Sequence, residues 1–495
     1  MRTVVVLMDT LKRNMMEVYN NETWVKTPNI TKFSKEAVTF DNHWVGSAPC
    51  MPARRDILTG RLNFLERSWG PIEPLEPFDI TLPKVLSEKN VFSHIVTDHP
   101  HYFRLGGEDY VQQFSTWDFY RGQEGDPWIS KIDDPSFMPD DYYGKLRRQY
   151  QWNRTKWERQ EDEYPTPKTF NAACEWLEDN KEHDDFFLMV ETFDPHEPFD
   201  VPEEYMKMYG CEYEGPYFET PNYKEVDVPD DALDYINKRY AALLTMTDKH
   251  FGKLIDKLKA LNIYEDTLVI VTTDHGYFLG ERNYFGKNYM HMYNELAHIP
   301  LLVHFPEGKM AGERVNVLTQ NIDIMPTVLD YSGVEIPEDV QGASWKPIPE
   351  GREYNREYAL YGYHGIAMNV TDGEHTYFRA PNKENKPCFE YTCIPTTIRK
   401  YLGKGREKEI EMGRFLKRTD YPVYKIPIEN PSILDNVDDA LKYTSESKLF
   451  NIVEDYPQVN PIKDETLENK YIDLLKRGLE EMDAPKEQFE RLNLK

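Results

Sequence analysis

The chain has 495 residues, of which 40% are hydrophobic and 13% aromatic, a composition typical of a folded globular protein with a large core. Its formal charge at pH 7 is −27, from 86 acidic and 59 basic residues, which excludes a general affinity for the phosphate backbone of nucleic acids. Any specificity for an anion must therefore come from a local cluster of cationic side chains or from a metal.

The N-terminal run from Met1 to Asp9 is short, rich in β-branched residues and closed by a polar one. This pattern predicts a buried strand at residues 3–8 rather than a signal peptide, and no later apolar stretch is long enough to cross a membrane. We therefore expect the chain as given to be cytoplasmic, with secretion as the alternative if a signal has been removed. The five cysteines have no CxxC spacing, so neither a disulfide framework nor a structural zinc site is indicated.

Strand and helix patterns alternate along the first two thirds of the chain, which favours a mostly parallel sheet covered by helices on both faces. Besides residues 3–8, the candidate strands are 91–96, 186–191, 267–273 and 300–305. A long helix with apolar residues at helical spacing is expected at about residues 231–261.

Polar residues follow directly after four of these strands. They are Asp9 and Thr10, then residues 97–99, 194–196 and 274–276. In open α/β sheets ligands bind beyond the carboxyl ends of the strands, so we expect these four segments to converge on one site.

Two regions depart from this alternation. Residues 104–167 are acidic and rich in Trp and Tyr, which indicates a functional insertion or a lid. After about residue 351 the chain shows short β-like runs at 358–363 and 376–379 and a charged helix at about 463–482. We therefore expect a catalytic domain at residues 1–350 and a smaller α+β subdomain at residues 351–495.

Cys50 lies between two prolines, Pro49 and Pro52, at the expected start of a helix. The N-terminus of a helix favours an anion, because its backbone N–H groups and its dipole point there. Arg54 follows one helical turn later and lies on the same face. The segment therefore predicts an anion site that contains a sulfur atom.

The sequence Cys50-Met-Pro52-Ala-Arg54, followed by Thr59-Gly60-Arg61, resembles the signature of the type I sulfatases. Further segments that match this family follow in its order: Asp9, His99 and His101, residues 194–198, residues 273–276, Gly286 and Lys287, and residues 448–455. The resemblance implies the alkaline-phosphatase-like fold, an α/β architecture in which a mixed, mostly parallel sheet is sandwiched by helices and joined to a smaller C-terminal α+β subdomain.

The resemblance also implies a nucleophile and a metal. Position 50 would carry Cα-formylglycine made from Cys50 by a formylglycine-generating enzyme or an anaerobic sulfatase-maturating enzyme. One hydroxyl of its hydrate would attack sulfur, with Asp274 assisting deprotonation. The metal would be Ca²⁺, with Mn²⁺ or Mg²⁺ as alternatives, bound by Asp9, Asp274, His275 and residue 50.

The remaining family roles concern the substrate. His196 and Lys287 would contact the sulfate and protonate the leaving oxygen. His101 would take the proton that releases sulfate from the enzyme, and Arg54 would hold the covalent intermediate. His99 stands where many family members carry lysine, and it is a further candidate for sulfate binding. Thr10 stands where many carry a second acidic ligand, so it is left out of the metal set.

Three functions remain open at this stage. The first is hydrolysis of a sulfate ester, of a small molecule or of a saccharide whose rings stack on the aromatic side chains of residues 104–167. The second is hydrolysis of a phosphonate or a phosphate mono- or diester with the same nucleophile. The third is an inactive binding homologue in which Cys50 remains a thiol.

Overall fold

The computed structural model describes residues 1–494 apart from 68–73, 105–108, 158–159, 396–405 and 429–436. The parts of the predicted insertion at 105–108 and 158–159 therefore lie outside the described residues. Within the described part, no helix combines the length and the apolar character needed to cross a membrane.

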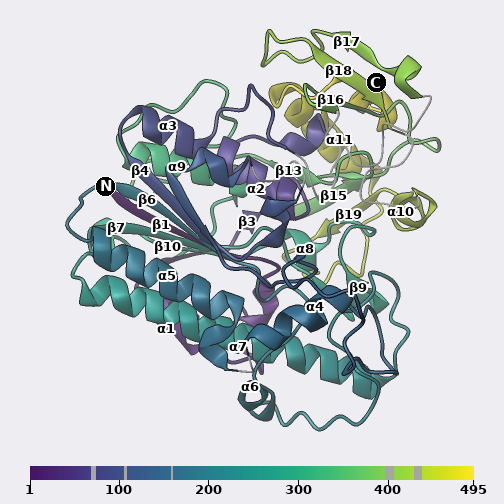
Figure 1. The fold of residues 1–495 in the computed structure, drawn as a ribbon. Coiled ribbons are helices and arrows are strands. Elements are labelled where there is room, and N and C mark those ends of the chain that lie inside the picture. Colours follow the sequence, from purple (N-terminus) through teal and green to yellow (C-terminus); the bar gives the residue numbers. More distant parts are fainter. Residues whose placement is uncertain (68–73, 105–108, 158–159, 396–405, 429–436, 495) are drawn as a thin grey trace.

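A sheet of eight strands in the order β11-β2-β10-β7-β1-β6-β4-β5 runs through the middle of the molecule (Figure 1). The strands are β1 (Arg2–Met8), β2 (Val38–Phe40), β4 (Phe92–Thr97), β5 (Thr116–Phe119), β6 (Phe186–Thr192), β7 (Thr267–Thr272), β10 (Leu301–His304) and β11 (Arg314–Val315). β7, β1, β6, β4 and β5 are parallel, whereas β10 is antiparallel to both its neighbours. The predicted mixed, mostly parallel sheet is confirmed.

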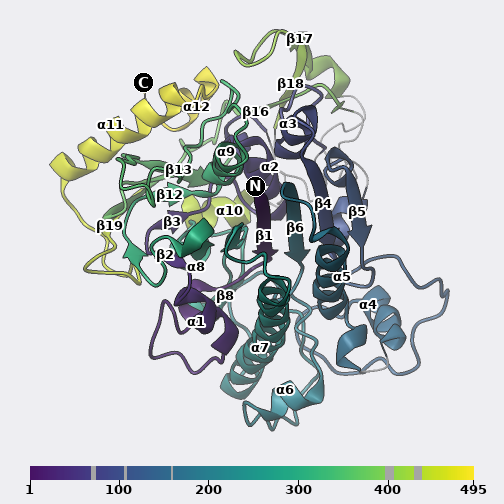
Figure 2. The same cartoon turned by 90° about the vertical axis from the view of Figure 1, so that its left-hand side faces the viewer.

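Two helical layers cover this sheet because successive side chains of a strand point to opposite faces. In β1, Val4 and Val6 belong to one apolar core and Val5 and Leu7 to the other. The first core includes residues of α1 (Pro28–Ser34), α5 (Pro165–Asn180) and α7 (Asp230–Ala260), and the second residues of α2 (Cys50–Thr59), α3 (Leu82–Glu88) and α9 (Ile324–Tyr331). Figures 1 and 2 show these two layers on opposite sides of the sheet.

The five predicted strands and the long helix α7 end within one or two residues of the predicted bounds. β5 was not predicted, and it lies in the region where the sequence shows no clear pattern. Its four residues alternate between polar and apolar, but the run is short, and its side chains are exposed or half-buried on an edge of the sheet, so the pattern does not stand out from the aromatic residues around it.

The C-terminal part is built on antiparallel sheets. One has the order β13 (Ala359–Gly362), β14 (Met368–Thr371), β15 (His375–Arg379) and β19 (Lys448–Asn451), and the other joins β16 (Phe389–Thr392), β18 (Val423–Pro427) and β17 (Glu411–Gly413). The helix α11 (Glu465–Glu481) contributes Tyr471, Leu475 and Leu479 to the apolar cluster that includes Leu360 and Val370. These elements match the predicted runs at 358–363 and 376–379 and the predicted helix at 463–482.

The end of β13 is hydrogen-bonded to the segment that leads into α2. Ala48 N donates to Gly362 O at 3.0 Å, and Gly362 N donates to Gly46 O at 3.1 Å. The predicted boundary at residue 350 falls before β13, so the two predicted units share a hydrogen-bonded edge just before Cys50.

Candidate active site

The register of the parallel strands brings their carboxyl ends to one edge of the sheet. Met8 pairs with Thr192, Leu7 with Thr272, and Thr97 with Glu191. The polar segments that begin at Asp9, Asp98, Asp194 and Asp274 follow directly at this edge. The convergence predicted from the sequence is therefore present in the structure.

Cys50 is the first residue of α2, with Pro49 as the N-cap and Pro52 in the first turn. Its Sγ lies 3.3 Å from His275 Nε2 and 3.2 Å from Lys287 Nζ, and only 2% of the residue is exposed. Burial, together with the carboxylates of Asp9 and Asp274, raises the pKa of the Cys50 thiol above its ordinary value.

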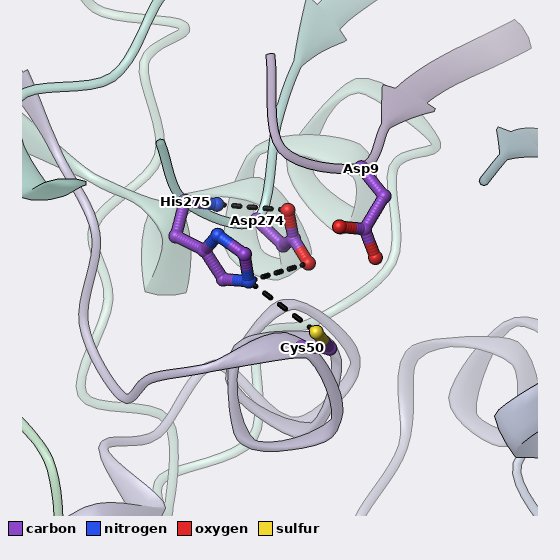
Figure 3. Close-up of side chains that lie close together, drawn as sticks. All are labelled: Asp9, Cys50, Asp274 and His275. Atoms are coloured by element: carbon purple, nitrogen blue, oxygen red, sulfur yellow. Dashed lines mark hydrogen bonds and ion pairs between the residues drawn. The ribbon is translucent and has the colours of Figure 1, made fainter. Parts of the chain in front are cut away.

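Four of the predicted metal-site residues form one cluster. One ligand atom each from Asp9, Cys50, Asp274 and His275 lies within 4.8 Å of the other three, and all four residues are buried (Figure 3). His275 Nδ1 donates to the carbonyl of Gly276 at 2.9 Å, so Nε2 carries the lone pair that could bind a metal. The cluster therefore has the geometry of a possible metal site.

Thr10, which was left out of the metal set, supports this cluster. Its hydroxyl donates to Asp9 Oδ1 at 2.6 Å, and its backbone N–H donates to Asp274 Oδ1 at 3.0 Å. Thr10 adopts a positive φ of 65°, so the chain turns sharply directly after Asp9.

Arg54 is fully buried at the centre of three carboxylates. It donates to Asp274 Oδ2 at 2.7 Å, to Asp9 Oδ2 at 2.9 Å and to Glu191, and also to the carbonyl of Cys50 at 3.0 Å. Burial alone would raise the pKa of Asp9, but Arg54 and Lys287 outweigh it and lower that pKa far below its usual range. Four of the five N–H groups of Arg54 are engaged, so one remains for the predicted contact with a sulfate.

Glu191 is a site residue that sequence analysis missed. It is the sixth residue of β6 and is fully buried, and burial, opposed by Arg54, raises its pKa to about 7. A carboxylate directly after the apolar run 186–190, within the predicted strand 186–191, is the signal that could have revealed it, because buried acids are rare unless they are paired.

Lys287 follows the short strand β9 (Phe285–Gly286). Its ammonium lies 3.1 Å from His275 Nε2 and 4.0 Å from Asp9 Oδ1, in addition to its contact with Cys50. Burial would lower the pKa of Lys287, but Cys50, Asp9 and Glu197 raise it, so the ammonium keeps its proton.

His196 lies in the loop after β6, where Nδ1 donates to the carbonyl of Glu197 at 2.7 Å. Burial lowers the pKa of His196 to about 3, and Glu197 opposes this shift while Lys287 adds to it. In this structure the ring is therefore neutral at pH 7, with its proton on Nδ1 and a lone pair on Nε2.

His99 and His101 lie next to each other, with ring centroids 4.8 Å apart. Within the described part of the chain, neither ring nitrogen of His99 has a hydrogen-bond partner. His101 Nε2 donates to Glu124 Oε2 at 2.9 Å, which leaves Nδ1 as the free nitrogen. Glu124 was not predicted, because a single acid in the acidic insertion 104–167 gives no signal of its own.

Both the sequence and the fold of this chain are similar to those of known proteins. The family model described as Sulfatase matches residues 2–334. An N-acetylglucosamine-6-O-sulfatase of Bacteroides thetaiotaomicron is 23% identical over 487 residues, covering 80% of this chain and 82% of that protein.

Two solved structures share the fold. The phosphonate monoester hydrolase of Agrobacterium radiobacter has a TM-score of 0.69 at 17% identity and covers 98% of this chain and 97% of its own. A protein solved with its substrate D-glucosamine-2-N,6-O-disulfate has a TM-score of 0.66 at 17% identity and covers 98% and 99%. Because the family model spans well over half of the sequence, the chain belongs to the sulfatase family of sulfuric ester hydrolases.

Proposed function

We propose that this enzyme hydrolyses a sulfate ester of a saccharide, and that residue 50 acts as a formylglycine made from Cys50. The observation that carries the proposal is the position of Cys50 Sγ, which lies between the carboxylates of Asp9 and Asp274, His275 and Lys287. The saccharide is favoured by the relative named as an N-acetylglucosamine-6-O-sulfatase and by the neighbour solved with a glucosamine disulfate.

The conversion of Cys50 needs a maturating enzyme and an external oxidant, and it exchanges the thiol for an aldehyde at Cβ. The hydrated aldehyde supplies two geminal hydroxyl groups, one to attack sulfur and one whose loss of a proton expels sulfate. The site itself has to neutralise the anionic ester before attack, because the sulfur is shielded by negatively charged oxygens.

A divalent cation suits the ligand set of this site, and Ca²⁺ is the ion that the family resemblance implies, with Mn²⁺ or Mg²⁺ as alternatives. Asp9, Asp274 and His275 would hold the ion together with residue 50, and carboxylate oxygens are ligands that Ca²⁺ prefers. With Glu191, the carboxylates carry up to three negative charges against the two positive charges of Arg54 and Lys287. A bound divalent cation would reverse that balance and would also lower the pKa of a coordinated hydroxyl.

The other side chains would handle protons. Lys287 keeps its proton and is suited to donate to the sulfate or to the leaving oxygen. His196 becomes an acid only when Nε2 is also protonated, a change that a bound sulfate anion favours. His101, with Nε2–H bound to Glu124 and Nδ1 free, is suited to accept the proton that precedes release of sulfate.

The proposal is tested by producing the protein together with a maturating enzyme and measuring hydrolysis of 4-nitrophenyl sulfate. Cys50→Ala is expected to lower kcat by about a thousandfold or more, because the nucleophile is lost. A chelator should abolish activity and Ca²⁺ should restore it. Mass spectrometry should detect the peptide that contains Cys50 at the lower mass of the aldehyde form, and the fraction of peptide in that form should follow the active fraction of the enzyme.

Two results would contradict the proposal. Retained turnover by Cys50→Ala would remove residue 50 as the nucleophile. Faster turnover of an aryl phosphonate monoester than of the aryl sulfate would replace the sulfatase by the phosphonate hydrolase considered in the sequence analysis.

A further inference from the structure

Three cations of the insertion lie near residues of the active site: Arg104, Lys145 and Arg147. About a quarter of each arginine side chain is exposed, 25% for Arg104 and 26% for Arg147, whereas Cys50 is 2% exposed. Both arginines pair with Glu124, at 2.9 Å and 2.6 Å, and Glu124 also binds His101. The two arginines are therefore more exposed than Cys50, and Glu124 links them to His101.

Lys145 and Gly286, the residue before Lys287, lie against the same aromatic ring, that of Tyr223. The ammonium of Lys145 lies 4.5 Å from the centroid of Tyr223, and the hydroxyl of Tyr223 donates to Glu197 Oε1 at 2.6 Å. A Cβ added to Gly286 would lie 2.4 Å from the Tyr223 ring, so the ring rests directly against the residue that precedes Lys287.

The backbone fixes the position of Lys145. Its N–H donates to the carbonyl of Thr220 at 2.7 Å, and Tyr143 N donates to Tyr217 O at 2.9 Å. Gly144 has a φ of +71°, and a Cβ there would lie 2.1 Å from the carbonyl oxygen of Thr220. Because only glycine permits this close approach, the segment that carries Lys145 is docked rather than free.

The cations of this region are not fully balanced. Within the described part of the chain, Lys145 forms no ion pair, and the buried Nε of Arg147 has no hydrogen-bond partner. Glu124 pairs with Arg104 and Arg147, and Glu197 interacts with Lys145, Arg147 and Lys287, so two carboxylates are shared among four cations. Burial lowers the pKa of Lys145, Glu197 and Glu124 oppose this shift, and Arg147 and Lys287 add to it, so a further anion beside Lys145 would favour its charged form.

We infer that Lys145 and Arg147 bind a second anionic group of the substrate, a carboxylate or a second sulfate, beside the sulfate that is cleaved. The inference rests on the proposed function, because it takes the cleaved sulfate to lie between Lys287 and residue 50. The preferred substrate class is then a saccharide sulfate with two negative charges. A local excess of positive charge is needed for this in a chain whose net charge is −27.

The test measures binding by calorimetry to full-length Cys50→Ala, which cannot turn the ligand over. The probes are N-acetylglucosamine 6-O-sulfate with one charge, D-glucosamine-2-N,6-O-disulfate with two sulfates, and a sulfated glucuronic acid whose second charge is a carboxylate. We expect at least one dianion to bind about tenfold more tightly than the monoanion, as a charge-assisted hydrogen bond allows. The tighter dianion identifies the second group.

Adding Lys145→Met should reduce this preference to about twofold or less, because methionine keeps an apolar chain on Tyr223 and removes the charge. The matched control is Lys131→Met, since Lys131 is an exposed lysine of the same insertion that lies 6.0 Å from the ring of Trp152. The control should keep the full preference.

Equal affinity for one and two charges, absence of dianion binding, or an unchanged preference in Lys145→Met would each overturn the inference. Hydrolysis of 4-nitrophenyl sulfate by the matured wild type is a separate measurement. A failure of the proposed function is therefore distinguishable from a failure of the charge preference.

Discussion

Arg54 holds together three carboxylates that come from the ends of three different strands. Removing the guanidinium would leave Asp9, Asp274 and Glu191 buried without a counter-charge from this residue. We expect Arg54→Ala to lower the free energy of unfolding by about 3–5 kcal/mol, the usual result of breaking a buried ion pair. Urea unfolding measures the loss.

The control for this prediction is Arg352→Ala, because Arg352 is an exposed arginine that pairs with Glu350. Its removal should change the free energy of unfolding by less than about 1 kcal/mol. Similar stability of the two variants would show that the three carboxylates do not depend on Arg54.

Under the proposed function, Glu124 is a positioning residue, because its carboxylate accepts from Nε2 of His101 and leaves Nδ1 without a proton. Glu124→Gln keeps the shape but removes the charge and introduces an amide group that also donates. We expect kcat for 4-nitrophenyl sulfate to fall by about ten- to a hundredfold with a smaller change in KM, since proton transfer rather than binding is affected. The alkaline and acid limbs of the pH–rate profile should also move.

Glu163→Gln serves as its control, because Glu163 lies in the same insertion and pairs with Lys168 at the surface. A Glu124→Gln enzyme with wild-type kcat and pH profile would contradict the positioning role.

The sequence predicted those site residues that belong to a motif or follow the end of a strand. Asp9 and Asp274 end buried strands, and Cys50 stands between prolines at a helix start. Glu124 has no such signal, and the partner of Glu191 could not be predicted, because their contacts to His101 and Arg54 join segments far apart in the chain. Such pairings depend on the folded register and not on local spacing.

At the scale of single elements, the structure at the end of α2 explains why the residue that follows this helix, Gly60, is a glycine. Gly60 caps the helix with a φ of +65°, and an added Cβ would lie 2.8 Å from Val340. We expect Gly60→Ala to cost about 1 kcal/mol for the backbone conformation plus a further loss from the contact. Thermal unfolding of the variant measures both together.

Gly333→Ala isolates the backbone contribution. Gly333 has a similar φ of +68°, and an added Cβ meets nothing within 4 Å. If Gly60→Ala were no more destabilising than Gly333→Ala, close packing at the end of α2 would not explain the glycine.

The strand β3 (His43–Trp44) contains a buried histidine, which makes the stability of the protein depend on pH. His43 is fully buried between Thr319 and Asn321, and burial lowers its pKa from 6.5 to about 3, against the effect of the Asn321 hydrogen bond. Below pH 6.5 only the unfolded chain protonates this ring, so stability is lost as the pH falls towards 3. We expect the stability advantage of wild type over His43→Asn to shrink by about 1.4 kcal/mol per pH unit below 6.5.

Denaturant unfolding at pH 7, 6 and 5 measures this advantage. An advantage that stays constant over this range would mean that His43 does not remain neutral in the folded protein.

The predicted elements were those with a strong internal pattern, such as α7 and the buried parallel strands. The antiparallel direction of β10 was not predicted, because a buried strand reads the same in either direction. β5 was not predicted because its run of four residues is short and lies in a segment rich in aromatic residues.

At the scale of the whole molecule, the C-terminal sheet completes the catalytic part. Leu62, Phe64 and Leu65, which follow α2, pack in one apolar cluster with Leu360 and Leu475. We expect residues 1–350 alone to lose the cooperative thermal transition and to bind a hydrophobic dye, because this cluster would face water. Differential scanning calorimetry and dye fluorescence of the fragment, with the full chain as control, measure the effect.

A fragment 1–350 that melts cooperatively and hydrolyses 4-nitrophenyl sulfate would show that the C-terminal part is dispensable.

The hydrogen bonds between Gly362 and the segment before Cys50 also affect the order in which parts of the chain become buried during synthesis. All ten residues of α2 are buried, and the strand that closes against its entry is synthesised long after position 50 has left the ribosome. Under the proposed function, a maturating enzyme that binds the backbone around Cys50 would have better access to it before β13 docks than after. The rate of chain elongation and the speed of this docking step would then affect the fraction of molecules that carry formylglycine.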